Sequence, residues 1–451
     1  MQLTEFIFEK TKFIGLTLII GLIFHGILGR PRWQYSPIYA LVMLCFLLII
    51  LYNFKLFDLN SDFIKWILSF GIIMIISSII LSFIFPLEKL PKPKGIYDVG
   101  TRTYNLEDKL RNEIYGEAKD GKRKIKYQIW YPTEETKGYK KAKWISEGKL
   151  LTRQLAKSMH LPFFMLDHTV QIDSNSYYKA PLKDDLESYP VVIISHGWRG
   201  FRELHTDFAE ELASNGFIAV SIDHTYGSQA IRFEDNTVAY LNKAALPRED
   251  NPGKYNYNSR LLVSTYGEDV ASVLNDLEKL NLDDRHFKGR LDLEKVGLLG
   301  HSTGGGGDVY ISLKDKRIKS VLGLDAWVYP IKYKILKESL SIPSLFLGSE
   351  QWSKEVNINV LDLLVKNSEN STLIQMNETN HVDFSMVYMY SPLTKYIGFT
   401  GKSGGRYSSE IQKEFILSFF NESLRNEGEY NKSYLEEIVG KYDNLKFIDI
   451  D

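Results

Sequence analysis

A short glycine-rich turn limits what this chain can fold into more than any other feature. Residues 300–304 read Gly-His-Ser-Thr-Gly, a G-x-S-x-G pentapeptide. The apolar run 295–299 before it is typical of a buried strand, and residues 308–311, after three further glycines, can continue as a helix. On such a strand-to-helix turn the serine hydroxyl stands above the sheet, and the glycines remove side chains that would clash there. The sequence therefore predicts that a substrate carbonyl can reach Ser302.

Beyond the N-terminal part, short apolar segments alternate with helical ones. The segments that resemble strands are 124–131, which alternates like an edge strand, 190–195, 217–223, 320–324, 344–347 and 372–376. The segments that fit helices are 203–214, 261–280 and 408–420. This alternation favours an α/β fold with a mostly parallel sheet covered on both faces. The long polar segment 225–260 is expected to form a loop or cap near the site.

Uncharged apolar runs mark the N-terminal part of the chain. Residues 13–29, 34–54 and 66–87 contain no Asp, Glu, Lys or Arg. A helix of about 20 residues crosses the hydrocarbon core of a bilayer, so three transmembrane helices are predicted. Two alternatives remain: buried helices of a soluble core, and a cleaved signal peptide for the first run. Ile-Leu-Gly at 27–29 is a poor cleavage site for the second alternative.

These patterns divide the chain into four parts. We expect a membrane domain at 1–90, a connector and entry segment at 91–123, an α/β-hydrolase domain at 124–425 and a C-terminal tail at 426–451. The predicted location is a membrane, with several passes. Lysines and arginines are nearly balanced between the two sides of the spans, so the side of the catalytic domain stays open.

Charge and cysteine content exclude some classes of protein. The formal net charge is −1, which gives no indication of a nucleic-acid surface. The single cysteine, Cys45, cannot form an internal disulfide.

A serine nucleophile needs an adjacent base, and a carboxylate to orient that base. His381 is the histidine that lies well beyond the serine, just after the last expected strand. Asp325 directly follows the strand 320–324, which fits the order serine, acid, histidine. Glu350, after the next strand, is the rival acid. We predict Ser302, Asp325 and His381 as the catalytic residues and leave Glu350 open.

The tetrahedral intermediate of acyl transfer needs donors for its oxyanion. Residues 195–200, Ser-His-Gly-Trp-Arg-Gly, follow an expected strand directly, and their glycines allow the backbone to turn towards the substrate. We therefore predict that the backbone amides of Trp198 and Thr303 form the oxyanion hole. A plain strand-to-helix turn at 196–197 is the alternative.

The same pieces resemble the plasma and type II intracellular platelet-activating factor acetylhydrolases, a family of α/β-hydrolases. The resemblance rests on segments in matching order, between residues 124 and 420: Ser-His-Gly at 195–197 with Phe-Arg at 201–202, Leu-Ala-Ser-Asn-Gly-Phe-Ile at 212–218, Gly-His-Ser-Thr-Gly-Gly at 300–305, Leu-Asp-Ala-Trp at 324–327, and His381. The Leu-Asp-Ala-Trp segment is the most specific, because it places the acid after an earlier strand than in most α/β-hydrolases. Departures are Thr303, where the family usually has an aromatic residue, Trp198, and the N-terminal spans.

The resemblance implies an α/β-hydrolase fold and calcium-independent hydrolysis of short or oxidised acyl esters of phospholipids. We therefore expect a membrane-anchored serine ester hydrolase with no cofactor and no metal, whose partners are an ester or phospholipid substrate and the membrane. A general carboxylesterase acting on small soluble esters is one alternative. An inactive hydrolase fold that serves as a binding module is the other.

Overall fold

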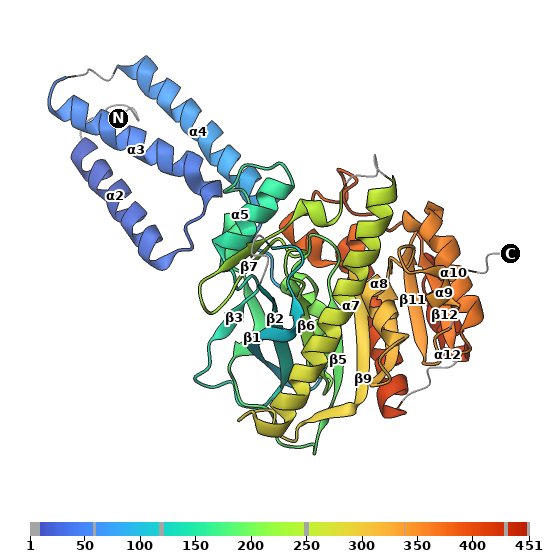
Figure 1. Ribbon diagram of the computed structural model, residues 1–451. Coiled ribbons are helices and arrows are strands. Elements are labelled where there is room, and N and C mark those ends of the chain that lie inside the picture. Colours follow the sequence, from blue (N-terminus) through green and yellow to red (C-terminus); the bar gives the residue numbers. More distant parts are fainter. Residues whose placement is uncertain are drawn as a thin grey trace.

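The fold has two visibly different parts, a helical bundle and a body built on one large sheet (Figure 1). The computed structural model describes residues 10–56, 60–116, 121–247, 252–337, 339–427 and 432–448. Residues 1–9 of the expected membrane domain and parts of the expected C-terminal tail lie outside the described residues.

The sheet of the described residues has 11 strands in the order β13-β12-β11-β10-β9-β5-β6-β2-β1-β4-β3. Their bounds are β1 Asp98–Asn112, β2 Lys122–Thr133, β3 Lys141–Lys143, β4 Asp173–Tyr178, β5 Tyr189–Ser195, β6 Ile218–Asp223, β9 Leu291–His301, β10 Ile318–Leu324, β11 Ser344–Ser349, β12 Ser371–Met376 and β13 Leu445–Phe447. The central strands from β6 to β12 pair in parallel. Antiparallel strands flank them on both sides. The prediction of a mostly parallel sheet is confirmed.

The expectation of an edge strand at 124–131 is wrong, because β2 lies inside the sheet, between β6 and β1. Its alternating lysines suggested an edge, but the Lys126 ammonium is largely buried and forms an ion pair with Glu147. Ile125 lies in the core on one face of β2, and Trp130 lies in the core on the other. The sheet also extends into segments 91–123 and 426–451 through β1 and β13.

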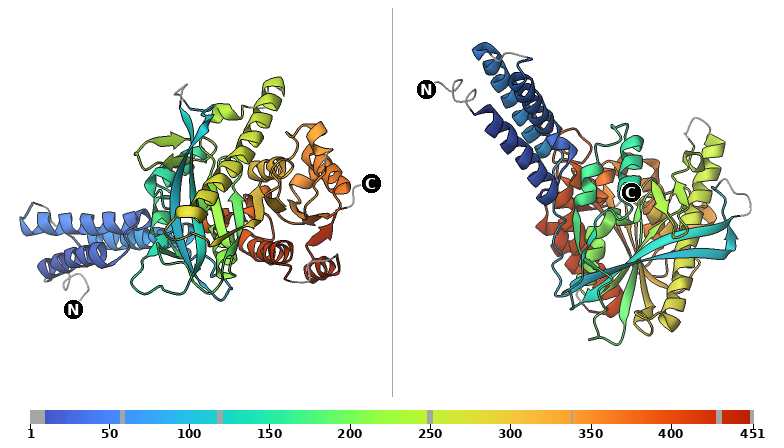
Figure 2. Two further views of the ribbon diagram at one scale, coloured as in Figure 1. Left: turned by 60° about the horizontal axis from the view of Figure 1, so that its bottom comes forward. Right: turned by 90° about the vertical axis from the view of Figure 1, so that its left-hand side faces the viewer.

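Helices cover both faces of the sheet, as the alternating pattern predicts (Figures 1 and 2). One face packs against α7 Pro252–Asp283, α8 Thr303–Ser312 and α10 Val356–Asn367. The other packs against α6 Thr206–Ser214, α11 Gly405–Phe420 and α12 Lys432–Lys441. Short elements complete the body: α5 Lys149–Ser158, α9 Tyr333–Leu336 and the hairpin of β7 Ala230–Arg232 with β8 Val238–Tyr240. The hairpin lies in the segment expected to be a loop or cap.

The N-terminal helices α2 Thr11–Leu28, α3 Ser36–Asn53 and α4 Ser61–Ile84 lie side by side and project from the body (Figures 1 and 2). Among the described residues, two helical segments are long and apolar enough to cross a membrane, Trp33–Asn53 and Ser61–Ile84. Only 6% and 11% of their apolar stretches are buried, which argues against core helices. The expectation of three full-length spans is not met, because the apolar part of α2 is limited to Phe13–Leu28.

The bundle is attached to the body through the segment that joins α2 to α3. The Trp33 indole N–H donates to the Met165 carbonyl at 2.9 Å, and the Gln171 amide donates to the Pro31 carbonyl at 2.8 Å. Within the bundle, the Gln34 amide donates to the carbonyl of Phe85, which directly follows α4, at 2.8 Å. These contacts hold the end of α4 against the body.

A buried charge cluster connects α7 to the neighbouring strands and gives a test of this packing. Asp269 accepts hydrogen bonds from Arg111 at 2.8 Å, Arg123 at 2.6 Å and His224 at 3.1 Å. Asp269→Ala would leave the Arg123 guanidinium buried without its main partner. We expect a loss of about 3–5 kcal/mol in the free energy of unfolding, measured by denaturant titration. The neighbouring Glu268→Ala, on a half-exposed side chain, should cost at most about 1 kcal/mol. Equal effects would contradict this role of Asp269.

Candidate active site

Ser302 occupies a tight turn between β9 and α8. Its backbone has φ 55° and ψ −120°, a strained conformation for a residue other than glycine. Its amide donates to the Leu324 carbonyl at 3.0 Å, and its carbonyl accepts from the amide of Trp327 at 2.9 Å. A Cβ on Gly304 would lie 2.3 Å from the Ser195 carbonyl oxygen, so glycine is needed there. The expected strand-turn-helix context of the pentapeptide is therefore present.

Asp325 follows the end of β10 and lies against His381, although 56 residues separate them in the chain. The imidazole Nδ1 donates to the Asp325 carboxylate at 2.9 Å. The same carboxylate accepts from the Ser349 amide and from the Ser349 hydroxyl, each at 2.6 Å. A carboxylate held at three points can fix the imidazole in one tautomer, with Nδ1 protonated and Nε2 free to accept a proton.

The rival acid, Glu350, lies elsewhere. Its carboxylate accepts from the amide of Glu378 at 2.8 Å, in the loop that leads to His381. Glu350 therefore supports the backbone before the histidine, and Asp325 contacts the ring itself.

Three further residues hold the Asp325–His381 pair, and no motif in the sequence indicated them; all three end β11 or follow it. Besides Ser349, the Gln351 side-chain oxygen accepts from the His381 amide at 2.8 Å. The Trp352 ring stacks on the imidazole, with centroids 4.1 Å apart and an interplanar angle of 5°. The polar segment after strand 344–347 could have indicated these residues, because ligand sites in parallel sheets lie at the carboxyl ends of the strands.

The predicted oxyanion-hole residues lie beside the serine. A Cβ on Gly197, which precedes Trp198, would lie 2.8 Å from the Cβ of Ser302. Thr303 is the first residue of α8, so its amide has no partner within the helix. Hydrogen bonds from the amides of Arg199 to Gly227 and of Gln229 to Gly200 hold the loop that carries Trp198.

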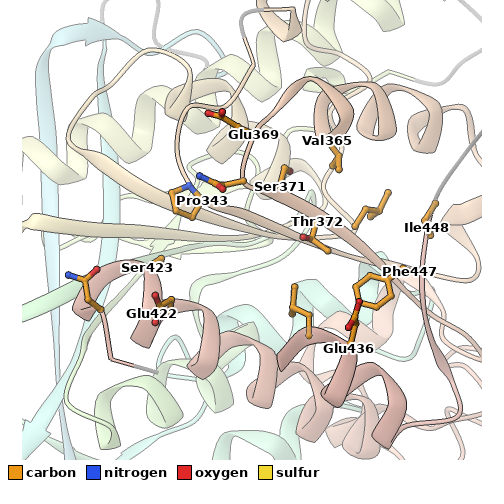
Figure 3. A pocket seen from close by; sticks show the side chains of 14 residues that line it. Pro343, Val365, Glu369, Ser371, Thr372, Glu422, Ser423, Glu436, Phe447 and Ile448 are labelled. Atoms are coloured by element: carbon orange, nitrogen blue, oxygen red, sulfur yellow. The ribbon is translucent and has the colours of Figure 1, made fainter. Parts of the chain in front are cut away.

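Two cavities meet at these residues. One, of about 720 Å³, is lined by Ser302, Thr303, Trp198 and His381. The other, of about 710 Å³, shares Ser302, Trp198 and His381 and extends in another direction. Among the described residues, the Ser302 hydroxyl and the His381 imidazole form no direct hydrogen bond, a separation that often closes only when substrate binds. A third cavity, of about 770 Å³ beside β12 and β13, contains none of the predicted site residues (Figure 3).

Other histidines near the site remain uncharged. Burial lowers the pKa of His301 well below its usual value, and the neighbouring His381 adds to this effect. Burial also lowers the pKa of His196 to about 3. The Nε2 atom of His301 lies 3.1 Å from the His381 carbonyl oxygen. His301 therefore contacts the backbone of His381 without placing a charge there. Within the described residues, no cluster of three or more His, Cys, Asp or Glu side chains could hold a metal ion.

The sheet order, the helices on both faces and the serine turn define an α/β-hydrolase fold. A ferulic acid esterase from Streptomyces cinnamoneus has the same fold, with a TM-score of 0.66 at 19% identity over 81% of this chain and 100% of the esterase. The family model for platelet-activating factor acetylhydrolase, isoform II, matches residues 83–254 and 258–443. The chain belongs to this family.

Curated relatives support this family assignment at modest identity. The platelet-activating factor acetylhydrolase of Cavia porcellus is 26% identical over 313 residues, covering 64% of this chain and 69% of the relative. The enzyme of the same name from Canis lupus familiaris is 24% identical over 390 residues, covering 79% and 82%. The named relatives are thus ester hydrolases.

A buried carboxyl group beneath the serine turn gives a test that needs no substrate. Burial raises the pKa of Asp308 to about 8, and its carboxyl accepts a hydrogen bond from Ser195 at 2.7 Å. Between about pH 4 and about pH 8 the folded state therefore holds a proton that the unfolded state has released. The contribution of Asp308 to the free energy of unfolding should fall as pH rises through this window, and Asp308→Asn should remove that contribution.

Unfolding midpoints at pH 5 and pH 8 measure the effect of Asp308. Asp315→Asn is the control, because Arg317 lowers the pKa of Asp315, which keeps its titration below pH 5. Parallel curves for the native chain and Asp308→Asn would contradict the protonated state.

Proposed function

We propose that this chain is a membrane-anchored serine hydrolase of carboxylic esters, with short-acyl or oxidised phospholipid esters as its substrates. The observation that carries the proposal is the Asp325–His381 hydrogen bond at the cavity wall that also holds Ser302. Membership of the acetylhydrolase family supports the ester chemistry and the lipid class.

The proposed reaction follows the geometry of the three residues. Ser302 Oγ attacks the ester carbonyl while His381 Nε2 takes the hydroxyl proton. The Trp198 and Thr303 amides donate to the oxyanion that forms. His381 then gives the proton to the leaving alcohol, which leaves an acyl group on Ser302. Water, deprotonated by His381, then attacks the acyl carbonyl. The bond to Ser302 Oγ breaks, Oγ takes the proton back from His381, and the acid is released.

Asp325 contributes to this reaction by orienting and stabilising the imidazole of His381. Its carboxylate keeps the proton of neutral His381 on Nδ1 and stabilises the imidazolium that forms at each step. Trp352 covers one ring face and Gln351 holds the backbone, so the imidazole has little freedom to turn away.

Membrane anchoring is part of the proposal. The apolar helices α3 and α4 would cross the bilayer, and residues 1–90 would form the membrane domain with the hydrolase body outside it. The support is the length of both helices and the exposure of their apolar side chains. An anchor of this kind would keep the active site close to amphiphilic esters, which partition into membranes.

Replacing the nucleophile tests the serine mechanism. Ser302→Ala should lower the turnover of p-nitrophenyl acetate by at least about a thousandfold, because no other group would form the acyl intermediate. Ser312→Ala, at the other end of α8 with a hydroxyl that has no hydrogen-bond partner among the described residues, should keep the native rate. Unchanged turnover in Ser302→Ala would reject the assignment.

The choice of acid is tested by a pair of amide substitutions. Asp325→Asn should lower kcat by about 10⁴, because an amide can favour the wrong imidazole tautomer. Glu350→Gln should change kcat by less than about tenfold, since its amide oxygen can still accept from Glu378. The reverse ranking would assign the acid to Glu350.

The substrate class needs a separate comparison. An enzyme specialised for lipids should prefer acetyl phospholipids to small soluble esters in kcat/KM, whereas a general carboxylesterase should show the opposite order.

A further inference from the structure

The second cavity connects the serine to the membrane helices. Its volume is about 710 Å³, within the range of about 300–1,000 Å³ that ligand sites usually have. At one end its lining includes Ser302 and His381. At the other it includes Ile84, the last residue of α4, and Phe85, the residue that caps it. A membrane helix therefore contributes to the wall of the cavity that holds the proposed nucleophile.

Most of the side chains that line the cavity between these two ends are apolar. Two parts of the chain supply many of its apolar residues: Leu155, Met159 and Leu161 come from α5 and the turn after it, and Val387, Leu393 and Ile397 come from the segment after His381. Such a wall offers few hydrogen-bond partners to water or to a charged headgroup, and suits an alkyl chain.

The cavity wall that includes the end of α4 also includes side chains exposed at the protein surface. Two lining residues are themselves exposed, Ile397 at 74% and Phe399 at 38%. Neighbouring apolar side chains outside the lining are exposed as well, with Phe163 at 59% and Tyr396 at 80%. An apolar opening with an exposed apolar rim marks an interaction site with a lipid or a protein surface.

Aromatic contacts indicate where the bilayer surface meets this opening. The Trp33 ring lies 5.3 Å from the Phe85 ring and 5.5 Å from the Phe164 ring. Trp33 and Phe85 lie at the ends of the two candidate spans. Tryptophan at the end of a span is typical of the boundary between hydrocarbon and water. The opening is therefore level with the bilayer surface, on the side where α4 ends.

We propose that the long hydrocarbon chain of the substrate enters this cavity from the bilayer, past Ile84 and Ile397, and that the end of α4 is part of the substrate site. This inference rests on the proposed ester hydrolysis at Ser302. Because the proposed acyl group is short, the long chain belongs to the glycerol part of the lipid. The polar headgroup then lies in the other cavity, whose wall carries Asn256 and Glu355.

The test uses the full chain reconstituted in phosphatidylcholine vesicles and two acetyl esters. 1-Hexadecyl-2-acetylglycerophosphocholine, dissolved in the vesicles, carries the long chain, and p-nitrophenyl acetate, in the buffer, does not. The readout is the ratio of the two turnover rates, which cancels differences in the amount of active protein.

Ile84→Trp should lower this ratio at least tenfold, because the indole would fill the cavity at its membrane end. Ile80→Trp makes the same change one turn earlier on α4, at a residue that is 51% exposed and outside the cavity wall. It should keep the native ratio. A native ratio in Ile84→Trp, or an equal loss in both variants, would overturn the proposal.

A second pair of variants guards against misfolding of Ile84→Trp. Ile397→Trp changes an exposed wall residue, and Tyr396→Trp changes its exposed neighbour outside the wall. Ile397→Trp should again lower the ratio at least tenfold, and Tyr396→Trp should not. If the long chain binds outside this cavity instead, both pairs will keep the native ratio. If the proposed function itself fails, the native chain will show no Ser302-dependent turnover of either ester.

Discussion

The strained turn at Ser302 is the constraint on which the rest of the site depends. A residue with positive φ between β9 and α8 is kept there by hydrogen bonds to Leu324 and Trp327, on both sides of Asp325. The same contacts therefore fix the serine and the segment that carries the carboxylate. Glycine at 304 lets α8 approach the end of β5, where the loop with Trp198 begins. One local geometry thus sets the positions of the proposed nucleophile, acid and oxyanion donors.

His381 comes from a more distant element and needs its own support. The segment after β11 supplies it: Ser349 holds the carboxylate, Gln351 the backbone and Trp352 the ring face. The bundle also meets the body at this cavity, because Ile84 of α4 lines it, and the segment that joins α2 to α3 contacts Met165 and Gln171. The helical bundle and the candidate active site are in this way neighbouring parts of one structure.

Much of the fold and of the candidate site could be predicted from local sequence. The strand before Ser302, the parallel sheet and the helices on its faces follow from short-range apolar patterns and glycine spacing. The position of β2 could not be predicted, since Lys126 resembles a solvent-facing residue until its buried partner Glu147 is known. The run 13–29 does locate α2, but the apolar part of that helix, Phe13–Leu28, is shorter than the two candidate spans. Contacts at a distance, such as Trp352 on His381, leave no periodic signal in the sequence.

The most direct measurement of the central claim is the site of covalent labelling by a fluorophosphonate, mapped by mass spectrometry of the folded chain. A serine activated by His381 and Asp325 should carry the phosphonyl group at Ser302, and Asp325→Asn should slow its labelling. Labelling at another residue, or none in correctly folded protein, would contradict the account.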